Sequence, residues 1–348
     1  MYDYFIIGQG LAGSLLAWKL IHAGKRILVL DNAHQHASSW VAAGLINPVT
    51  GMRMVKSPYT ELWLQQANSC YQQIEDELEI SIRHHLPMWR IFTNQKQLDA
   101  WQERISAPEY ADYLEEATID NNALPYHIKH GTGIIHHTGY IDTKQLLTAI
   151  KQWLVEHNSY LQVELDYDQV MVGDKLITLH DMQANNIIFC EGYRGTHNPW
   201  FKQLPLTPVK GEILTLQHEQ PLPNAIINFG KWLLPINAKQ FKFGATYDWA
   251  NIDQVPTAKA KQHLLDALHK QLNCELDIQL LQHEAGLRPN SQDRLPLIGP
   301  HKQYPNMYCF NGFGSRGSLM IPFYAQHLLL HLLEHQPLDP HCHIDRFS

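Results

Sequence analysis

The sequence lacks the patterns typical of metal-binding, disulfide-bonded and membrane-spanning proteins. Its five cysteines are scattered with no CxxC pair, which indicates free thiols in a reducing compartment rather than a disulfide framework. The 22 histidines include no HExxH motif, so we expect no metal site. The chain also has no run of ~18 apolar residues, which argues against a membrane span.

Positive charge is scarce as well. Lysine and arginine total 27 against 34 acidic residues, giving a formal net charge of −7, and no long basic run is present. We therefore do not expect the chain to bind nucleic acid or an anionic membrane on its own. The N-terminus has neither the basic start nor the long apolar core of a secretory signal, so we expect a cytoplasmic protein. No pattern in the sequence indicates an oligomeric state.

A βαβ pattern opens the chain. The apolar residues 4–7 predict a strand that stops at Gly8. Apolar residues at helical spacing predict a helix over 11–23, which a glycine then ends. Residues 26–30 predict a second strand, and Asp31 follows it directly.

The turn of this unit carries GxGxxG over residues 8–13. Gly8 permits a tight turn, Gly10 lets the backbone approach a pyrophosphate, and Gly13 lets helix and strand pack closely. A phosphate then lies at the helix N-terminus, where unpaired N–H groups favour negative charge. Asp31 can accept hydrogen bonds from a ribose 2′-hydroxyl and would repel a 2′-phosphate, which disfavours NADP. The unit predicts a bound dinucleotide without separating FAD from NAD.

The rest of the chain predicts helices and strands with no internal repeat and no linker. We expect helices over 61–82, 143–157, 257–272 and 318–334, with Asp142 as the N-cap of the second. We expect strands over 86–93, 133–141, 160–166 and 187–190, a hairpin at 173–174 and a β-rich stretch over 206–247.

Several further segments follow this opening in a fixed order. They are residues 38–45, 187–193, 286–289 with 293–299, and the glycine-rich turn 311–317. Together with the GxGxxG turn they resemble the D-amino-acid oxidase superfamily of flavoproteins, whose members include glycine oxidase and sarcosine oxidase. The resemblance spans the whole chain. It implies that the dinucleotide is FAD, bound non-covalently, because no cysteine stands near 291–294 where sarcosine oxidase has its flavin-linked one.

The resemblance also implies the fold class and the domains. We expect an α/β protein, α+β overall, in which a Rossmann-type FAD-binding domain is interleaved with an antiparallel-sheet substrate domain. The FAD-binding domain would comprise residues 1–80, 140–205 and 285–348. The substrate domain would comprise residues 81–139 and 206–284.

A set of cofactor-binding residues follows from the resemblance. The turn 314–317 is implied to lie beside the flavin pyrimidine edge, where a helix N-terminus and Arg316 would stabilise the charge of the reduced flavin. Glu191 departs from the small residue that the family usually has, and Val170 aligns roughly with a residue whose backbone meets adenine. The expected cofactor-binding residues are Gly8, Gly10, Leu11, Ala12, Gly13, Asp31, Asn32, Ser39, Ala43, Gly44, Leu45, Val170, Glu191, Gly192, Gly312, Gly314, Ser315, Arg316 and Gly317.

On the substrate side, Arg288 corresponds to the family arginine that binds the substrate carboxylate, for which a guanidinium fork is well suited. Arg53 and Lys56 resemble a basic pair of sarcosine oxidase, one near the flavin and one near the substrate. Trp232 stands where the family often has an aromatic wall, and Tyr247 is a weaker candidate of the same kind.

These residues imply an FAD-dependent oxidase or dehydrogenase of a small amine or amino acid. Hydride passes from the carbon beside nitrogen to flavin N5, water hydrolyses the imine, and O₂ or another acceptor reoxidises the flavin. The sequence around 314–317 also resembles the FAD-containing half of the bifunctional enzyme that modifies tRNA wobble uridine, so removal of a carboxymethyl group from that nucleoside is an alternative. A non-catalytic flavin-binding protein is a third interpretation, which only Glu191 favours.

Overall fold

Two sheets dominate the computed structural model, which describes residues 1–33, 37–117, 125–173, 176–220, 222–273 and 277–347. The first sheet has the order β11-β2-β1-β14-β13-β12, and β21 pairs with both β14 and β20. Its centre is parallel: β1 pairs with β2 and β14, β2 with β11, and β14 with β21. The strands are β1 (Tyr2–Ile7), β2 (Ile27–Asp31), β11 (Tyr160–Gln162), β12 (Val170–Val172), β13 (Ile177–Leu179), β14 (Met182–Phe189), β20 (Leu297–Pro300) and β21 (Met307–Asn311).

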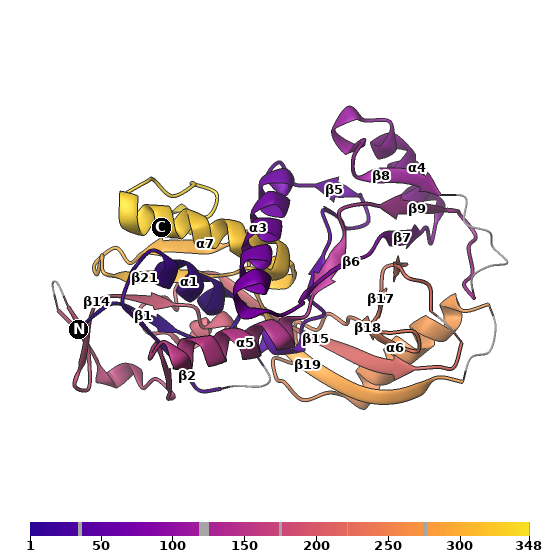
Figure 1. Ribbon diagram of the computed structural model, residues 1–348. Helices are drawn as coiled ribbons and strands as arrows, with labels where there is room; N and C mark the ends of the chain where they lie inside the picture. The colour runs from indigo at the N-terminus through magenta and orange to yellow at the C-terminus, as the bar shows by residue number, and fades with distance from the viewer. Residues whose placement is uncertain (34–36, 118–124, 174–175, 221, 274–276, 348) are drawn as a thin grey trace.

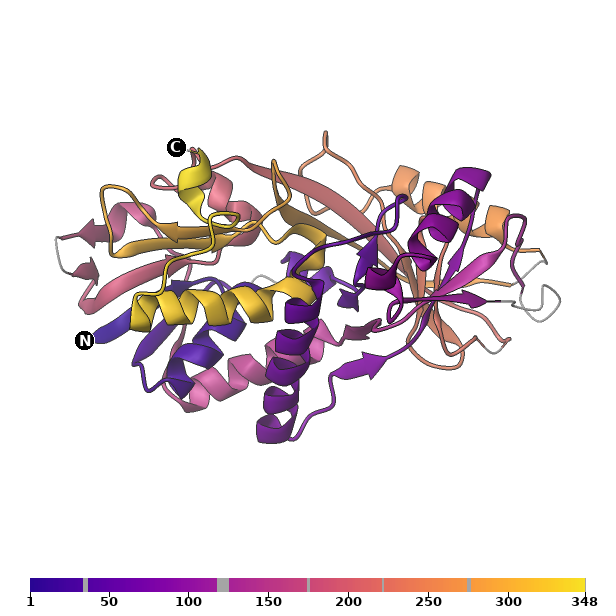
Figure 2. The same cartoon turned by 90° about the horizontal axis from the view of Figure 1, so that it is seen from above.

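Both faces of this sheet are buried. Tyr4 and Ile6 of β1 pack with helices on one face, whereas Phe5 and Ile7 belong to the core on the other face. This explains why β1 reads as a continuous apolar run. The helices on the first face are α1 (Leu11–His22), α3 (Thr60–Leu78), α5 (Thr143–Glu156) and α7 (Gly317–Glu334), and Figures 1 and 2 show them together.

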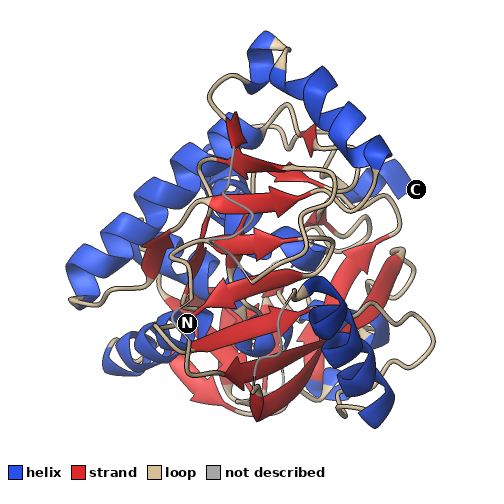
Figure 3. Cartoon of the chain, turned by 90° about the vertical axis from the view of Figure 1, so that its right-hand side faces the viewer, coloured by secondary structure: helices blue, strands red, loops and turns tan. Residues whose placement is uncertain are grey.

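The second sheet has the order β19-β15-β18-β17-β16-β7-β9-β8 and is antiparallel apart from the β16–β7 pair. Figure 3 views the molecule from this side. The strands are β7 (Met88–Ile91), β8 (Leu114–Ala117), β9 (Thr132–Ile135), β15 (Leu206–Gln217), β16 (Ile226–Asn228), β17 (Trp232–Pro235), β18 (Gln240–Gly244) and β19 (Gln279–Ser291). Helix α6 (Ala258–Gln271) packs Leu264 and Leu268 against one face, and α4 (Gln95–Ile105) packs Trp101 against Gly133.

Short elements complete the described part of the chain. A three-stranded sheet has the order β3-β10-β6, and β4 pairs with β5. These elements are α2 (Ser38–Val41), β3 (Leu45–Ile46), β4 (Val49–Thr50), β5 (Val55–Lys56), β6 (Arg83–His85), β10 (Gly139–Ile141), and the 3₁₀ turns η1 (Pro108–Tyr110), η2 (Tyr167–Gln169), η3 (Gly192–His197), η4 (Gly314–Arg316) and η5 (Ile344–Phe347). Among the described residues, no helix is long and apolar enough to cross a membrane.

The structure confirms the predicted βαβ unit and the helices near 143, 257 and 318. Asp142 caps α5, because its carboxylate accepts the Gln145 N–H at 3.0 Å. The single strand predicted over 133–141 is wrong: His137 takes a φ of 55°, and the chain forms β9 and β10 instead. The strand predicted over 160–166 ends at Gln162.

The predicted class, a mixed α/β fold with a Rossmann-type unit, is confirmed. The division into two interleaved domains stays a prediction. The boundary expected at residue 285 falls inside β19, which continues in the second sheet to Ser291. Part of the predicted hairpin at 173–174 lies outside the described residues.

Candidate cofactor and substrate site

A cavity extends from the carboxyl edge of the first sheet to the second sheet. Its empty space, including the part open to solvent, is about 1690 Å³. The first sheet contributes the residues that follow β1, β2, β14 and β21, and the second contributes side chains of β15, β17 and β19. Ligands of open parallel sheets bind at this edge, so the topology places the cavity where a dinucleotide is expected.

The glycine turn forms one end of the cavity. Gly8 has a φ of +100°, and a Cβ there would lie 2.7 Å from the Cys190 carbonyl oxygen. A Cβ on Gly13 would lie 1.9 Å from the Gly8 carbonyl oxygen, so glycine is needed for helix and strand to approach this closely. Helix α1 then starts from Gly10 with no side-chain cap. The N–H groups of its first turn, apart from that of Leu11, are therefore available to an anionic ligand.

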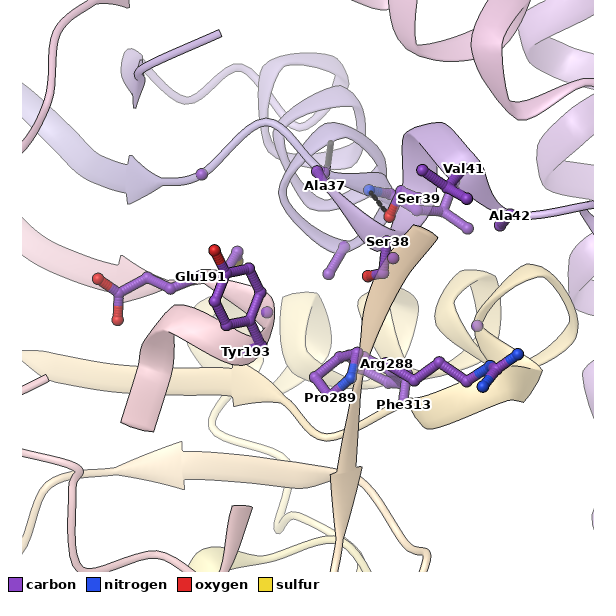
Figure 4. Close-up of a pocket in the computed structure, with 18 of the residues that line it drawn as sticks. Ala37, Ser38, Ser39, Val41, Ala42, Glu191, Tyr193, Arg288, Pro289 and Phe313 are labelled. Carbon is purple, nitrogen blue, oxygen red and sulfur yellow. Dashed lines mark hydrogen bonds between the residues drawn. The ribbon is translucent and has the colours of Figure 1, made fainter. Parts of the chain in front are cut away.

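Ser39 and Asp31 hold the backbone around this turn. The Ser39 Oγ accepts the Leu11 N–H at 3.1 Å, the contact dashed in Figure 4. The Asp31 carboxylate accepts the Gln9 N–H at 2.9 Å and the Ala33 N–H at 2.7 Å. A carboxylate has further lone pairs, and Asp31 lines the cavity, so it can also accept hydrogen bonds from ribose hydroxyls.

Most of the residues predicted to bind the cofactor line this cavity. They are Gly8, Gly10, Leu11, Ala12, Asp31, Asn32, Ser39, Ala43, Gly44, Leu45, Glu191, Gly192, Gly314, Ser315 and Gly317. Gly13, Val170, Gly312 and Arg316 do not line it. Val170 is buried in the core on the far face of the first sheet. The Arg316 guanidinium lies 5.5 Å from the Trp63 ring and donates to the Arg294 carbonyl oxygen at 3.2 Å, and burial lowers its pKa.

Glu191 has partners of its own. Its carboxylate accepts the Tyr167 hydroxyl at 2.6 Å and the Asn198 amide at 2.8 Å. Loss of water around this carboxyl raises its pKa to about 7. Figure 4 shows the Glu191 side chain extending away from Arg288. The residue that departs from the family pattern therefore sits in a local hydrogen-bond network.

Arg288 defines the other end of the cavity. It lies on β19, and its guanidinium crosses Gly211 of β15 so closely that a Cβ there would lie 2.1 Å from Nη2. Its Nη1 donates to the Thr246 carbonyl oxygen at 3.1 Å, and the Tyr247 ring centroid is 4.4 Å from its Cζ. Burial lowers the pKa of this guanidinium.

No carboxylate of the described residues lies within salt-bridge distance of Arg288. The acids that line the cavity, Asp31, Glu164 and Glu191, all come from the edge of the first sheet. The lining residues that come from the second sheet and the segment after β18, besides Arg288, are Gly211, Ile213, Trp232, Tyr247, Gly286 and Pro289, and none of them is acidic. A partly buried guanidinium that faces a cavity, without an acidic partner among the described residues, offers a binding position for an anion.

The predicted basic pair lies elsewhere. Neither Arg53 nor Lys56 lines the cavity. The Lys56 ammonium is 4.3 Å from the Tyr113 ring centroid and 5.8 Å from that of Tyr110, while Arg53 is exposed in the turn before β5. Trp232 and Tyr247, in contrast, line the cavity with Arg288.

Other lining residues were not singled out from the sequence. Tyr193 and Arg194 follow Gly192, and Gly211, Ile213 and Gly286 come from the second sheet. The signal that could have found Gly211 is a glycine inside the predicted β-rich stretch, which marks a close approach of another group, whereas Gly286 lies in the segment 286–289 that carries the resemblance. A Cβ on Gly286 would lie 3.2 Å from Val41 of α2.

Comparison with known proteins identifies the family. The profile of the family DAO, FAD dependent oxidoreductase, matches residues 3–329. The chain belongs to this family of FAD-dependent oxidoreductases. Glycine oxidase of Pseudomonas aeruginosa is 22% identical over 342 residues, covering 91% of each chain. The crystal structure of glycine oxidase from Geobacillus kaustophilus superposes with a TM-score of 0.82 at 18% identity, covering 100% of this chain and 98% of that one.

Two further relatives are named for another substrate or another process. Iminodiacetate oxidase from Chelativorans sp. BNC1 superposes with a TM-score of 0.81 at 19% identity, covering 99% of this chain and 98% of that one. The tRNA 5-methylaminomethyl-2-thiouridine biosynthesis bifunctional protein MnmC of Legionella pneumophila is 24% identical over 368 residues. That match covers 93% of this chain and 53% of the relative, so the chain spans about half its length.

The cavity fits the cofactor of the DAO family. At Gly8 and Gly13 the turn has no room for a Cβ, α1 offers the N–H groups of its first turn other than that of Leu11, and Asp31 offers acceptors for ribose. These are the donors and acceptors that the phosphate and ribose parts of FAD require. The predicted FAD dependence is thereby confirmed at the level of the family, and the individual contacts stay predictions.

Proposed function

We propose that this DAO-family oxidoreductase oxidises the C–N bond of a small amine or amino acid that carries a carboxylate. One observation carries the proposal: a partly buried Arg288, without an acidic partner among the described residues, faces the cavity that also contains the glycine turn. A guanidinium fork binds a carboxylate through parallel hydrogen bonds. Two relatives support the class of substrate, since glycine and iminodiacetate are both amines that carry carboxylates.

In this proposal the residues bind and orient the substrate. FAD, when bound, accepts the hydride from the carbon beside nitrogen. Arg288 holds the carboxylate, and the Trp232 and Tyr247 rings line the cavity with it, where they orient the substrate. Because no acidic side chain of the described lining stands at this end, the substrate amine is expected to react in its uncharged form. O₂ or another acceptor would then reoxidise the flavin.

The test is reduction of the flavin without oxygen, followed by absorbance, with glycine, iminodiacetate and D-amino acids as candidate substrates. For a substrate that bleaches the wild type, Arg288→Ala should raise KM by ~10- to 100-fold, because a charge-assisted hydrogen bond contributes ~1.5–3 kcal/mol. The KM of Arg288→Lys should lie between those of the wild type and Arg288→Ala, because lysine keeps the positive charge but lacks the guanidinium fork. Arg104→Ala, which removes a partly exposed guanidinium of α4, is the matched control. Unchanged KM and kcat in Arg288→Ala would overturn the proposal.

A second candidate is a tRNA-modifying reaction on a carboxymethylaminomethyl nucleoside. The similarity to MnmC supports it, as do the exposed rings of Tyr247 and Trp249, whose centroids are 6.2 Å apart beside Arg288. The net charge of −7 argues against it. Bleaching of the flavin by the free nucleoside or by tRNA, but by no small amine, would favour this candidate.

A further inference from the structure

Segment 245–257, which connects β18 to α6, completes the surroundings of Arg288. Thr246 provides the carbonyl oxygen that accepts the Arg288 guanidinium, and Tyr247 places its ring 4.4 Å from Arg288 Cζ. At its far end, Gln254 accepts the hydroxyl of Tyr193, another lining residue, at 3.3 Å. The geometry of the carboxylate site therefore depends on where this segment lies.

Two buried charged residues of β15 hold the segment. The Lys210 side chain is fully buried, and its ammonium donates to the Asp253 carboxylate and to the Val255 carbonyl oxygen, both at 2.6 Å. The Glu212 side chain is nearly as buried, and its carboxylate accepts the Thr257 N–H at 2.8 Å and the Thr257 hydroxyl at 3.0 Å. Thr257 is also the N-cap of α6.

The alternation of side chains along β15 relates Lys210 and Glu212 to Arg288. Successive side chains of a strand point to opposite faces, so Lys210 and Glu212 share one face and Gly211 between them has the other. Gly211 is the residue across which the Arg288 guanidinium lies. Backbone hydrogen bonds also join segment 245–257 to β15. Lys210 and Asp248 exchange two of them, at 2.9 and 3.0 Å, and the Thr246 N–H donates to the Glu212 carbonyl oxygen at 3.2 Å.

Buried ion pairs contribute little to stability, since desolvation offsets most of the attraction, and their best-attested use is to specify one arrangement. We propose that Lys210 and Glu212 are positioning residues that fix segment 245–257 and so set Thr246 and Tyr247 against Arg288. The inference rests on the proposed role of Arg288 as the carboxylate clamp. Neither residue lines the cavity, so both act through the segment they hold.

The experiment uses the FAD-loaded protein and acetate as a carboxylate probe that lacks the amine, with binding followed by the change in flavin absorbance. Asp253→Asn is the main variant, because Asp253 is 55% exposed and its replacement should leave folding intact. Lys210→Met and Glu212→Gln remove the buried charges directly. Lys239→Met, which breaks an exposed ion pair with Glu219 in the same sheet, is the control.

We expect Asp253→Asn and Lys210→Met to weaken acetate binding by about tenfold and to raise KM for the substrate while kcat changes less. Asp253→Glu, which keeps the carboxylate, should restore much of the affinity, and Lys239→Met should bind as the wild type does. Acetate affinity and KM unchanged in Asp253→Asn, with only a lower melting temperature in Lys210→Met, would overturn the inference. If Arg288→Ala also binds acetate as tightly as the wild type, the clamp itself is wrong, and the proposed function fails instead.

Discussion

Gly211 allows the carboxylate clamp to be tested without touching Arg288. A Cβ at this position would lie 2.1 Å from Arg288 Nη2 and 2.3 Å from both Cζ and Nη1. To restore an ordinary contact, the guanidinium must move by about 1.3 Å, and a displacement near 1 Å can cost on the order of 100-fold in rate. Gly211 has no positive φ, so alanine fits its backbone and the strand.

We therefore expect Gly211→Ala to lower kcat/KM for a carboxylate-bearing substrate by about 100-fold, which corresponds to ~2.7 kcal/mol of transition-state stabilisation. Steady-state kinetics with that substrate, and with an amine of similar size that lacks the carboxylate, separate the effect on the clamp from a general effect. For the amine that lacks a carboxylate, Gly211→Ala should change kcat/KM little. Flavin content and melting temperature should stay close to those of the wild type. A Gly211→Ala enzyme with unaltered kcat/KM for the carboxylate substrate would refute the assignment of Arg288.

Three further predictions concern the cofactor end and the amine. Asp31→Ala should weaken FAD binding by at least ~10-fold, because a carboxylate that accepts hydrogen bonds is lost, and a fluorescence titration of apoprotein with FAD measures this. The pKa of Glu191 is raised from 4.5 to about 7, so its contribution to stability is full below pH 4.5 and is lost as pH rises through 7. Glu191→Gln should flatten that part of the unfolding free energy against pH, and an unaltered profile would contradict the assignment. Finally, kcat/KM should rise with pH as the substrate ammonium loses its proton and becomes the uncharged amine, and stopped-flow reduction at a series of pH values would measure this.

Local patterns predicted the cofactor end of the site well. The turn 8–13, Asp31 and the strands beside them are close in sequence, and their chemistry depends on residues within one βαβ unit. The resemblance added the segments around residues 192 and 314, which line the same cavity. The lining at this end could be predicted because its residues either lie close together in the sequence or belong to segments that the family resemblance identifies.

The substrate end was harder to predict because it depends on long-range pairing. Gly211 meets Arg288 only because β15 and β19 pair over their whole length, from residue 206 with 291 to residue 217 with 279. Nothing near residue 211 in sequence reports that register. Lys56 illustrates the converse, since its spacing suggested the cavity, whereas in the fold its ammonium lies against Tyr113 and Tyr110.

The two ends of the cavity follow one physical rule, which is that the polypeptide leaves room where a ligand or a functional group must come close. At Gly8 and Gly13 the absence of side chains lets backbone pack against backbone, and the first turn of α1 keeps N–H groups, other than that of Leu11, that an anion can bind. At Gly211 the absent side chain admits a guanidinium instead. The burial of Lys210 and Glu212, which flank Gly211 on the opposite face of β15, then has a reason. The Arg288 guanidinium packs against the backbone at Gly211, so its position depends on how firmly that backbone and segment 245–257 are held.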